Sequence, residues 1–180
     1  MGSIGRIPVL LSIAAALLVP GRLEAQSAHE REAYFRAVAE YFALPPDEVA
    51  ILGSWDLPPD EIPVVLFVAA RAGVSPEALT ALRESGASWA SLASRYRIGA
   101  AQLHVPLSRS PDGGALAETY RRYAATPAGQ WSEISLSDEE IVTLVNVRVL
   151  SSVLGVPPDR VLERRATSSG FAQLYARMIG

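Results

Sequence analysis

Residues 57–96 read LPPDEIPVVLFVAARAGVSPEALTALRESGASWASLASRY, and residues 136–178 repeat the pattern as LSDEEIVTLVNVRVLSSVLGVPPDRVLERRATSSGFAQLYARM. The copies align at an offset of 79 residues at their start and of 82 residues from the glycine in the middle onward. Three added residues make somewhat less than one helical turn, so we expect them to lengthen the first helix of the second copy. The sequence therefore predicts an internal duplication.

Each copy is predicted to fold into three helices. Ser137 with Glu140 is a capping-box signal at the start of the second copy, and Asp60 is the corresponding N-cap candidate of the first. Gly73 and Gly155 tolerate a positive φ and end the first helix, after which a proline begins the second helix in both copies. The third helices carry apolar residues at i, i+3, i+4 and i+7, the spacing of one buried face: Trp89, Leu92, Ala93 and Tyr96, and Phe171, Leu174, Tyr175 and Met178.

The segments outside the copies complete an all-α, helical-repeat-like arrangement. Residues 33–42 have helical apolar spacing, and Pro45-Pro46 repeats the proline start, which together predict an N-terminal helical half-unit that caps the array. A stretch rich in proline and glycine joins the two homologous three-helix units and has room for one helix at 115–124. The expected division is a half-unit at 26–56, a first unit at 57–106, a linker at 107–134 and a second unit at 135–180.

The first 25 residues have the pattern of a signal peptide. Arg6 precedes an apolar stretch at 7–19, which is shorter than the roughly 20 residues that span a bilayer. We expect cleavage after Ala25, with Ala28 as a second possible position and an uncleaved anchor as the alternative. A periplasmic or secreted protein without a stable membrane span follows from this pattern.

Composition excludes several classes of protein. The 180 residues include no cysteine, which rules out disulfide scaffolds and thiolate metal sites. The formal net charge is −3, and removing residues 1–25 leaves 14 basic and 18 acidic residues, a net charge of −4. Because a weakly acidic chain does not concentrate polyanions, we expect no nucleic-acid partner.

Few residues have the pattern of a catalytic or metal site. His104 could form a triad with Ser108 and Asp112, although no G-x-S-x-G motif accompanies it. The paired acids at 60–61 and 138–140 could serve acid–base chemistry or a divalent cation, but capping of the following helix accounts for them. We therefore expect no metal, no cofactor and no enzymatic activity.

Residues 88–98, SWASLASRYRI, resemble two helix-turn-helix modules. One is the centre of the glycan-binding LysM module, whose flanking valine-rich strand and Gly-Asp-Thr are missing here. The other is a DNA-reading helix-turn-helix, which conflicts with export and negative charge. A stripe of core residues on one helix explains the same pattern.

Polar and aromatic residues in unexpected places provide candidates for contacts. Asn146 and Arg148 interrupt an apolar helix, and we expect them to join the two copies by hydrogen bonds, because buried polar groups need partners. Tyr120, Tyr123 and Trp131 in the linker are a candidate partner-binding surface, the alternative being packing against the repeats.

The chain resembles a family of uncharacterised exported bacterial proteins through DEIPVV at 60–65, AGVSP at 72–76, Ser88-Trp89, and LSD at 136–138 with Val145-Asn146. That resemblance implies an envelope location and a duplicated helical architecture, and it assigns no activity to any residue. We expect an exported helical binding or structural module of the bacterial cell envelope, with an envelope protein or a glycan as partner. The alternatives are a LysM-like binder of peptidoglycan and an envelope hydrolase.

Overall fold

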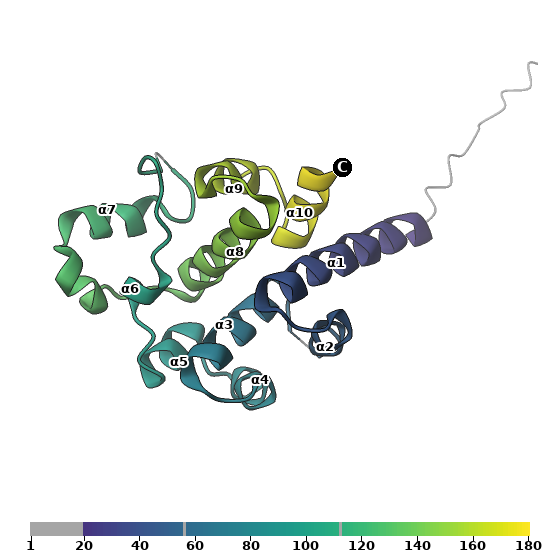
Figure 1. Cartoon of the computed structure of the whole chain (residues 1–180), viewed down its shortest axis with the longest axis horizontal. Helices are drawn as coiled ribbons and strands as arrows, with labels where there is room; N and C mark the ends of the chain where they lie inside the picture. Colours follow the sequence, from purple (N-terminus) through teal and green to yellow (C-terminus); the bar gives the residue numbers. More distant parts are fainter. Residues whose placement is uncertain (1–19, 56, 112) are drawn as a thin grey trace, which may run out of the picture.

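A computed structural model describes residues 20–55, 57–111 and 113–180. These residues form helices and connecting turns without any strand, which confirms the predicted all-α class (Figure 1). The α-helices are α1 (Pro20–Phe42), α2 (Pro46–Leu52), α3 (Ile62–Ala72), α4 (Pro76–Glu84), α5 (Trp89–Arg95), α6 (Ala100–Leu103), α7 (Ala117–Ala125), α8 (Asp138–Leu154), α9 (Pro158–Arg165) and α10 (Phe171–Ile179). Two short 3-10 helices, η1 (Pro59–Glu61) and η2 (Ala128–Glu133), precede α3 and follow α7.

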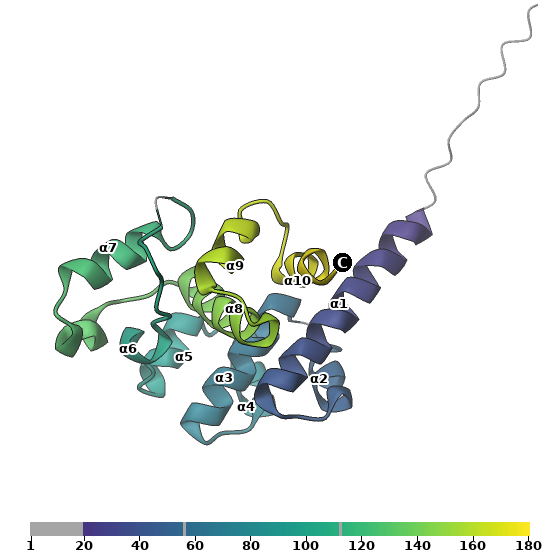
Figure 2. The same cartoon turned by 45° about the horizontal axis from the view of Figure 1, so that its top comes forward.

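The core is organised around α3 and α8, which pack against each other in the middle of the molecule (Figures 1 and 2). Residues 62–69 of α3 are all buried, as expected for a helix that is apolar on every side. Helix α8 is buried over most of its length but carries the polar side chains of Thr143 and Asn146 inside the core. The two helices therefore form a scaffold, on which α4, α5, α6 and α9 pack.

Helices end where the sequence predicts. Gly73 ends α3 with a φ of 66°, and Gly155 ends α8 with a φ of 62°, both in the left-handed region that glycine adopts without strain. In each case the next N–H group, of Val74 or Val156, donates to a carbonyl five residues back. Ala43 ends α1 in the same way with a φ of 52°, although it is not a glycine.

The helix starts are partly as expected. Ser137 and Glu140 form the predicted capping box at α8. The prediction that Asp60 caps its own helix is wrong, because its carboxylate accepts the N–H of Phe171 at 3.0 Å and so caps α10. In the same way, the Asp138 carboxylate accepts the N–H of Ala90 in α5 at 3.0 Å. Each carboxylate at the start of a long helix thus binds the start of the aromatic helix in the other half of the chain.

The N-terminal helix α1 contacts helices from the last part of the chain, whereas the sequence predicts a half-unit that caps the array of repeats. Helix α1 packs along α10 and α8, with α2 beside it, and its first turns extend away from the body (Figures 1 and 2). It begins earlier than the predicted helix at 33–42. Residues 1–19 of the expected signal peptide lie outside the described part of the chain, and residues 20–25 belong to α1.

No described helix is by itself long and apolar enough to cross a bilayer. Helices α8 and α9 reach the length and hydropathy of a membrane span only when taken together, and the chain bends by 118° between them.

The linker at 107–134 contains the predicted helix, which is α7, and the additional 3-10 helix η2. A short helix that the sequence does not predict, α6, contacts both η2 and α8. Residues 107–134 therefore fold back onto α6 through η2.

Candidate functional site

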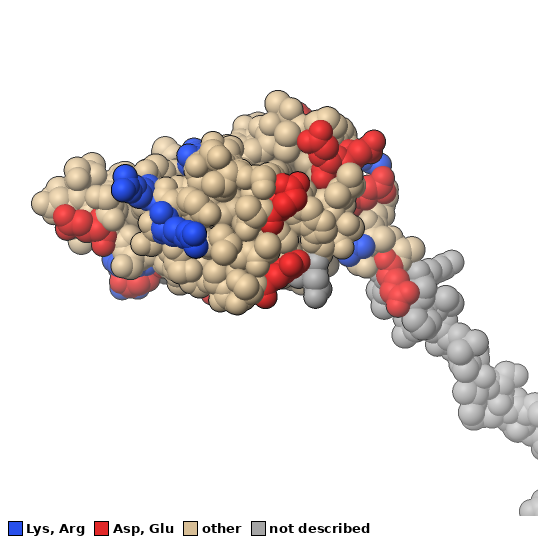
Figure 3. Space-filling view, turned by 90° about the horizontal axis from the view of Figure 1, so that it is seen from below, with Lys and Arg blue, Asp and Glu red and all other residues tan. Residues whose placement is uncertain are grey.

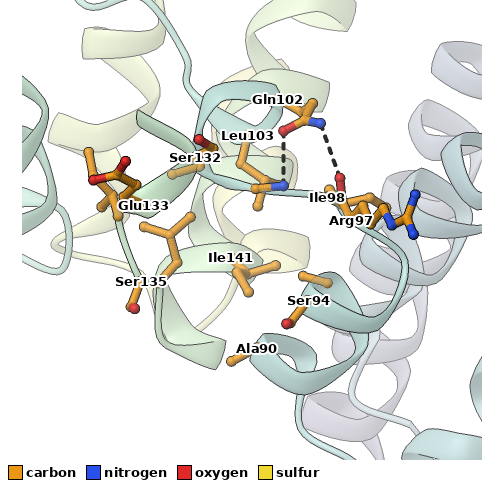
Figure 4. Close-up of a pocket in the computed structure, with 15 residues that line it drawn as sticks. Ala90, Ser94, Arg97, Ile98, Gln102, Leu103, Ser132, Glu133, Ser135 and Ile141 are labelled. Carbon is orange, nitrogen blue, oxygen red and sulfur yellow. Dashed lines mark hydrogen bonds between the residues drawn. The ribbon is translucent and has the colours of Figure 1, made fainter. Parts of the chain in front are cut away.

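A cleft of about 410 Å³ opens between the α5–α6 helix-turn-helix on one side and residues 132–136 on the other (Figure 4). The start of α8 closes its base with Ile141. The floor is apolar and the rim is polar. Floor residues are Ala90, Ala93, Ile98, Leu103, Leu136 and Ile141, and rim residues are Ser94, Arg97, Gln102, Ser132, Glu133 and Ser135.

The first wall of the cleft is shaped by a tight turn between α5 and α6. Arg97 adopts a φ of 57°, and the N–H of Ile98 donates to the Ala93 carbonyl at 2.8 Å. The Gln102 side chain spans this turn, because its oxygen accepts the N–H of Gly99 at 2.9 Å and its nitrogen donates to the Arg97 carbonyl at 3.2 Å (Figure 4). The turn is thus held in one conformation by its own side chains.

The second wall is held by a charged cluster behind it. Arg122 of α7 donates to the carbonyl of Ser135 and to the carboxylate of Glu140. The Thr119 hydroxyl also donates to Glu140, at 2.5 Å. Burial alone would raise the pKa of Glu140, but the hydrogen bonds from Thr119, Ser137 and Arg122 outweigh it and lower that pKa. An ionised Glu140 therefore fixes Arg122, and Arg122 fixes the extended segment.

The rim groups determine what the cleft can bind. Serine hydroxyls and the Gln102 amide donate and accept hydrogen bonds, and Arg97 and Glu133 add one charge of each sign. Both charged residues are exposed. Such a rim around an apolar floor matches a ligand that has polar groups along its edges and an apolar face, such as a sugar chain or a peptide.

The predicted partner-binding residues Tyr120, Tyr123 and Trp131 lie together. The ring centroid of Tyr123 is 5.5 Å from that of Tyr120 and 5.0 Å from that of Trp131. His104, which was not predicted to join them, packs 4.4 Å from the Trp131 ring and 4.7 Å from the Tyr123 ring. Tyr120 and Tyr123 are buried, and their hydroxyls donate to the carbonyls of Val105 and Ala100. Of the three candidates, only Trp131 is partly accessible.

This aromatic cluster fastens the linker onto α6. Burial raises the pKa of Tyr123 to about 12, and it also raises the pKa of Tyr120. Burial, together with the positive charge of Arg148, lowers the pKa of His104. The cluster therefore consists of neutral rings whose polar atoms are largely used within the fold.

The proposed triad is not assembled by contacts in the described residues. The Ser108 hydroxyl donates to Asp159 at 3.1 Å, and His104 lies within the aromatic cluster. Asp112, the third residue, lies outside the described part of the chain. Over residues 20–55, 57–111 and 113–180, no group of three His, Asp or Glu side chains is arranged to hold a metal ion.

Asn146 and Arg148 make the predicted hydrogen bonds, which join residues 135–180 to residues 57–106. The Asn146 amide donates to the Asp60 carbonyl at 2.8 Å, and Arg148 donates to the carbonyls of Gln102 and His104 at 2.9 and 2.8 Å. Arg148 thereby holds the end of α6, whose Gln102 side chain lines the cleft.

Charge is distributed unevenly on the face seen from below. Most acidic side chains of that face lie toward the end that holds α1, and the larger arginine patches lie toward the opposite end (Figure 3). Arg95 and Arg97, both exposed, belong to α5 and the turn that follows it. On the face shown, the larger arginine patches therefore lie toward the end of the molecule that holds α5 and α6.

No protein-family model, curated protein or solved structure matches this chain. Residues 88–98, which have the helix-turn-helix pattern, supply much of the first wall of the cleft. The second wall could not be predicted, because residues 132–136 carry no motif and reach the cleft only through the fold of the linker.

Proposed function

We propose that this protein is a helical binding module of the bacterial cell envelope, built from two homologous helical units, whose ligand binds in the cleft between α5–α6 and residues 132–136. Support for the envelope location is the signal-peptide pattern at residues 1–25. The proposal rests above all on the cleft itself, which combines an apolar floor with a polar rim and is held open by internal hydrogen bonds.

The two-unit arrangement is supported by matching local geometry. Helices α3 and α8 end on left-handed glycines with φ values of 66° and 62°, and a proline begins the next helix in both cases. The aromatic helices α5 and α10 then bury Trp89 and Phe171 almost completely. Because the same succession of ends and starts occurs twice, a duplicated unit is the simplest origin of the fold.

A glycan is the ligand that a second observation favours. The segment that resembles the LysM helix-turn-helix is the one that lines the cleft, through Ala90, Ser94 and Arg97. The flanking strand of a LysM module has no counterpart among the described residues, so the likeness is restricted to this segment. Peptidoglycan is the glycan to test first, because it is the polymer of the proposed compartment.

The experiment fills the cleft with one side chain. In Ser94→Trp an exposed residue of α5 that lines the cleft becomes bulky, and in Ser91→Trp an exposed serine of the same helix that does not line it undergoes the same change. Both variants and the unmodified protein are incubated with purified peptidoglycan, and the bound fraction is measured after sedimentation. Circular dichroism verifies that the two variants fold alike.

Loss of sedimentation in Ser94→Trp but not in Ser91→Trp supports a glycan in the cleft. Where the unmodified protein does not sediment, a photo-crosslinking residue at position 94 and the same residue at position 91 are compared in cells. A protein partner captured only from position 94 supports the binding module with a protein ligand. Equal behaviour of the two positions in both experiments contradicts the assignment of the cleft.

A further inference from the structure

The partly buried arginines of the described residues differ in their partners. Arg83 binds the Glu61 carboxylate at 2.8 Å and lies 3.5 Å from Asp138, and Arg122 binds Glu140. The Arg148 side chain is half-buried, yet no carboxylate of the described residues lies within 4.0 Å of it. Buried or half-buried charges are normally paired, so this guanidinium requires an explanation.

A second arginine, Arg71, for which the described residues also supply no carboxylate partner, lies near the same aromatic ring. The guanidinium carbon of Arg71 is 3.6 Å from the centre of the Phe67 ring, and that of Arg148 is 5.0 Å from the same centre. Phe67 is fully buried, whereas Arg71 is exposed at the end of α3. Two guanidiniums from different helices therefore lie against one buried aromatic ring.

The two guanidiniums repel each other where they are. Burial lowers the pKa of Arg148, and the charge of Arg71 lowers it further, while Tyr41 near the end of α1 acts in the opposite direction. Arg148 is held in place, because one of its nitrogens donates to the carbonyls of Gln102 and His104. Phe67 attracts both cations but carries no charge that could neutralise them.

We propose that Arg71 and Arg148 form a binding site for a phosphate group, either free or esterified. A phosphate carries close to two negative charges and several acceptor oxygens, so one group can neutralise and hydrogen-bond two guanidiniums at once. A single carboxylate supplies only one charge. This site is separate from the cleft, since neither arginine lines it, and it does not depend on the proposed function.

The test measures phosphate binding to the full chain by isothermal titration calorimetry, with sodium chloride of equal ionic strength as the reference. Arg71→Gln removes one charge at an exposed position that tolerates the change. Arg95→Gln is the matched control, because Arg95 is also exposed and also lies near an aromatic ring, at 5.8 Å from Tyr96. We expect Arg71→Gln to weaken phosphate binding by roughly tenfold or more, and Arg95→Gln to leave it unchanged.

Glycerol phosphate and acetate complete the experiment. Tighter binding of glycerol phosphate than of inorganic phosphate supports an esterified phosphate as the natural ligand, and the reverse order supports the free ion. Acetate that binds as tightly as phosphate contradicts the assignment. The proposal is also overturned if the unmodified protein binds phosphate no better than Arg71→Gln does, or if both arginine variants lose the same affinity.

Discussion

The Tyr34 hydroxyl of α1 donates a hydrogen bond to the side-chain oxygen of Asn146 in α8, joining residues that are 112 positions apart. Both side chains are fully buried. The amide nitrogen of Asn146 donates in turn to the carbonyls of Asp60 and Val142, each at 2.8 Å. One side chain thus connects α1, α8 and η1, in a core that is otherwise almost entirely apolar.

Replacing the Asn146 amide is expected to lower the stability of the protein. Asn146→Ala leaves the Tyr34 hydroxyl and the Asp60 carbonyl buried without their partner, so we expect the free energy of unfolding to fall by roughly 2–4 kcal/mol in urea denaturation. Tyr34→Phe removes only one group and is expected to cost about 1 kcal/mol. The double variant should lose clearly less than the sum of the two, and additive losses would show that the two groups are not coupled.

A stabilising change is expected at the end of α1. Ala43 is exposed and holds a φ of 52°, a conformation that costs a residue with a side chain roughly 1 kcal/mol. Ala43→Gly should therefore raise the free energy of unfolding by about 0.5–1 kcal/mol, although glycine normally destabilises. Ala43→Val should lower it, because a branched side chain fits this conformation poorly. A loss of stability in Ala43→Gly would contradict the geometry of this turn.

The lowered pKa of Glu140 predicts that the free energy of unfolding depends on pH. Its pKa in the folded protein is below the ordinary 4.5, so its contribution is present above pH 4.5 and is lost as the pH falls through the lowered value. Glu140→Gln keeps the capping box but removes the charge, and is expected to cost about 1–2 kcal/mol at pH 7. The difference between the two proteins should shrink in urea titrations as the pH falls below 4.5. A constant difference over this range would exclude the charge as its cause.

The lowered pKa of His104 predicts a second change in stability, nearer to neutral pH. Burial and Arg148 lower its pKa below 6.5, so the folded protein favours the neutral ring and loses stability as the pH falls below 6.5. His104→Phe keeps an aromatic ring in the cluster and should remove this part of the loss, which we expect to be less than about 1 kcal/mol because the ring is partly solvated. Thermal unfolding followed by tryptophan fluorescence between about pH 5 and 8 measures the difference. Parallel curves for the two proteins would contradict the role of His104.

Local features of this fold could be predicted from the sequence. The glycine ends at 73 and 155 and the Ser137 capping box depend on a few neighbouring residues, and the structure confirms all three. Asp60 marks the limit of such reasoning. Its position in the chain suggests a cap for the next helix, but its carboxylate binds a helix start 111 residues away, which only the packing of α10 against η1 makes possible.

The candidate site shows the same limit. The α5 side of the cleft belongs to a segment with a recognisable pattern, whereas Ser132, Glu133 and Ser135 are placed there by Arg122 and by the contact of η2 with α6. The aromatic residues of the linker lie together in the structure, and their role as a partner-binding surface stays a prediction. Their exposure could not be predicted, because Tyr120 and Tyr123 look identical in sequence whether they face solvent or the carbonyls of Val105 and Ala100.

The crossed binding of Asp60 to α10 and of α10 to α1 has a consequence for biogenesis. Asp60 and α1 are separated from α10 by most of the chain. The ribosome must therefore finish α10 before α1 and η1 can make their contacts with it. Until then the nascent polypeptide lacks these contacts, which is compatible with the proposed export through a channel that accepts unfolded chains.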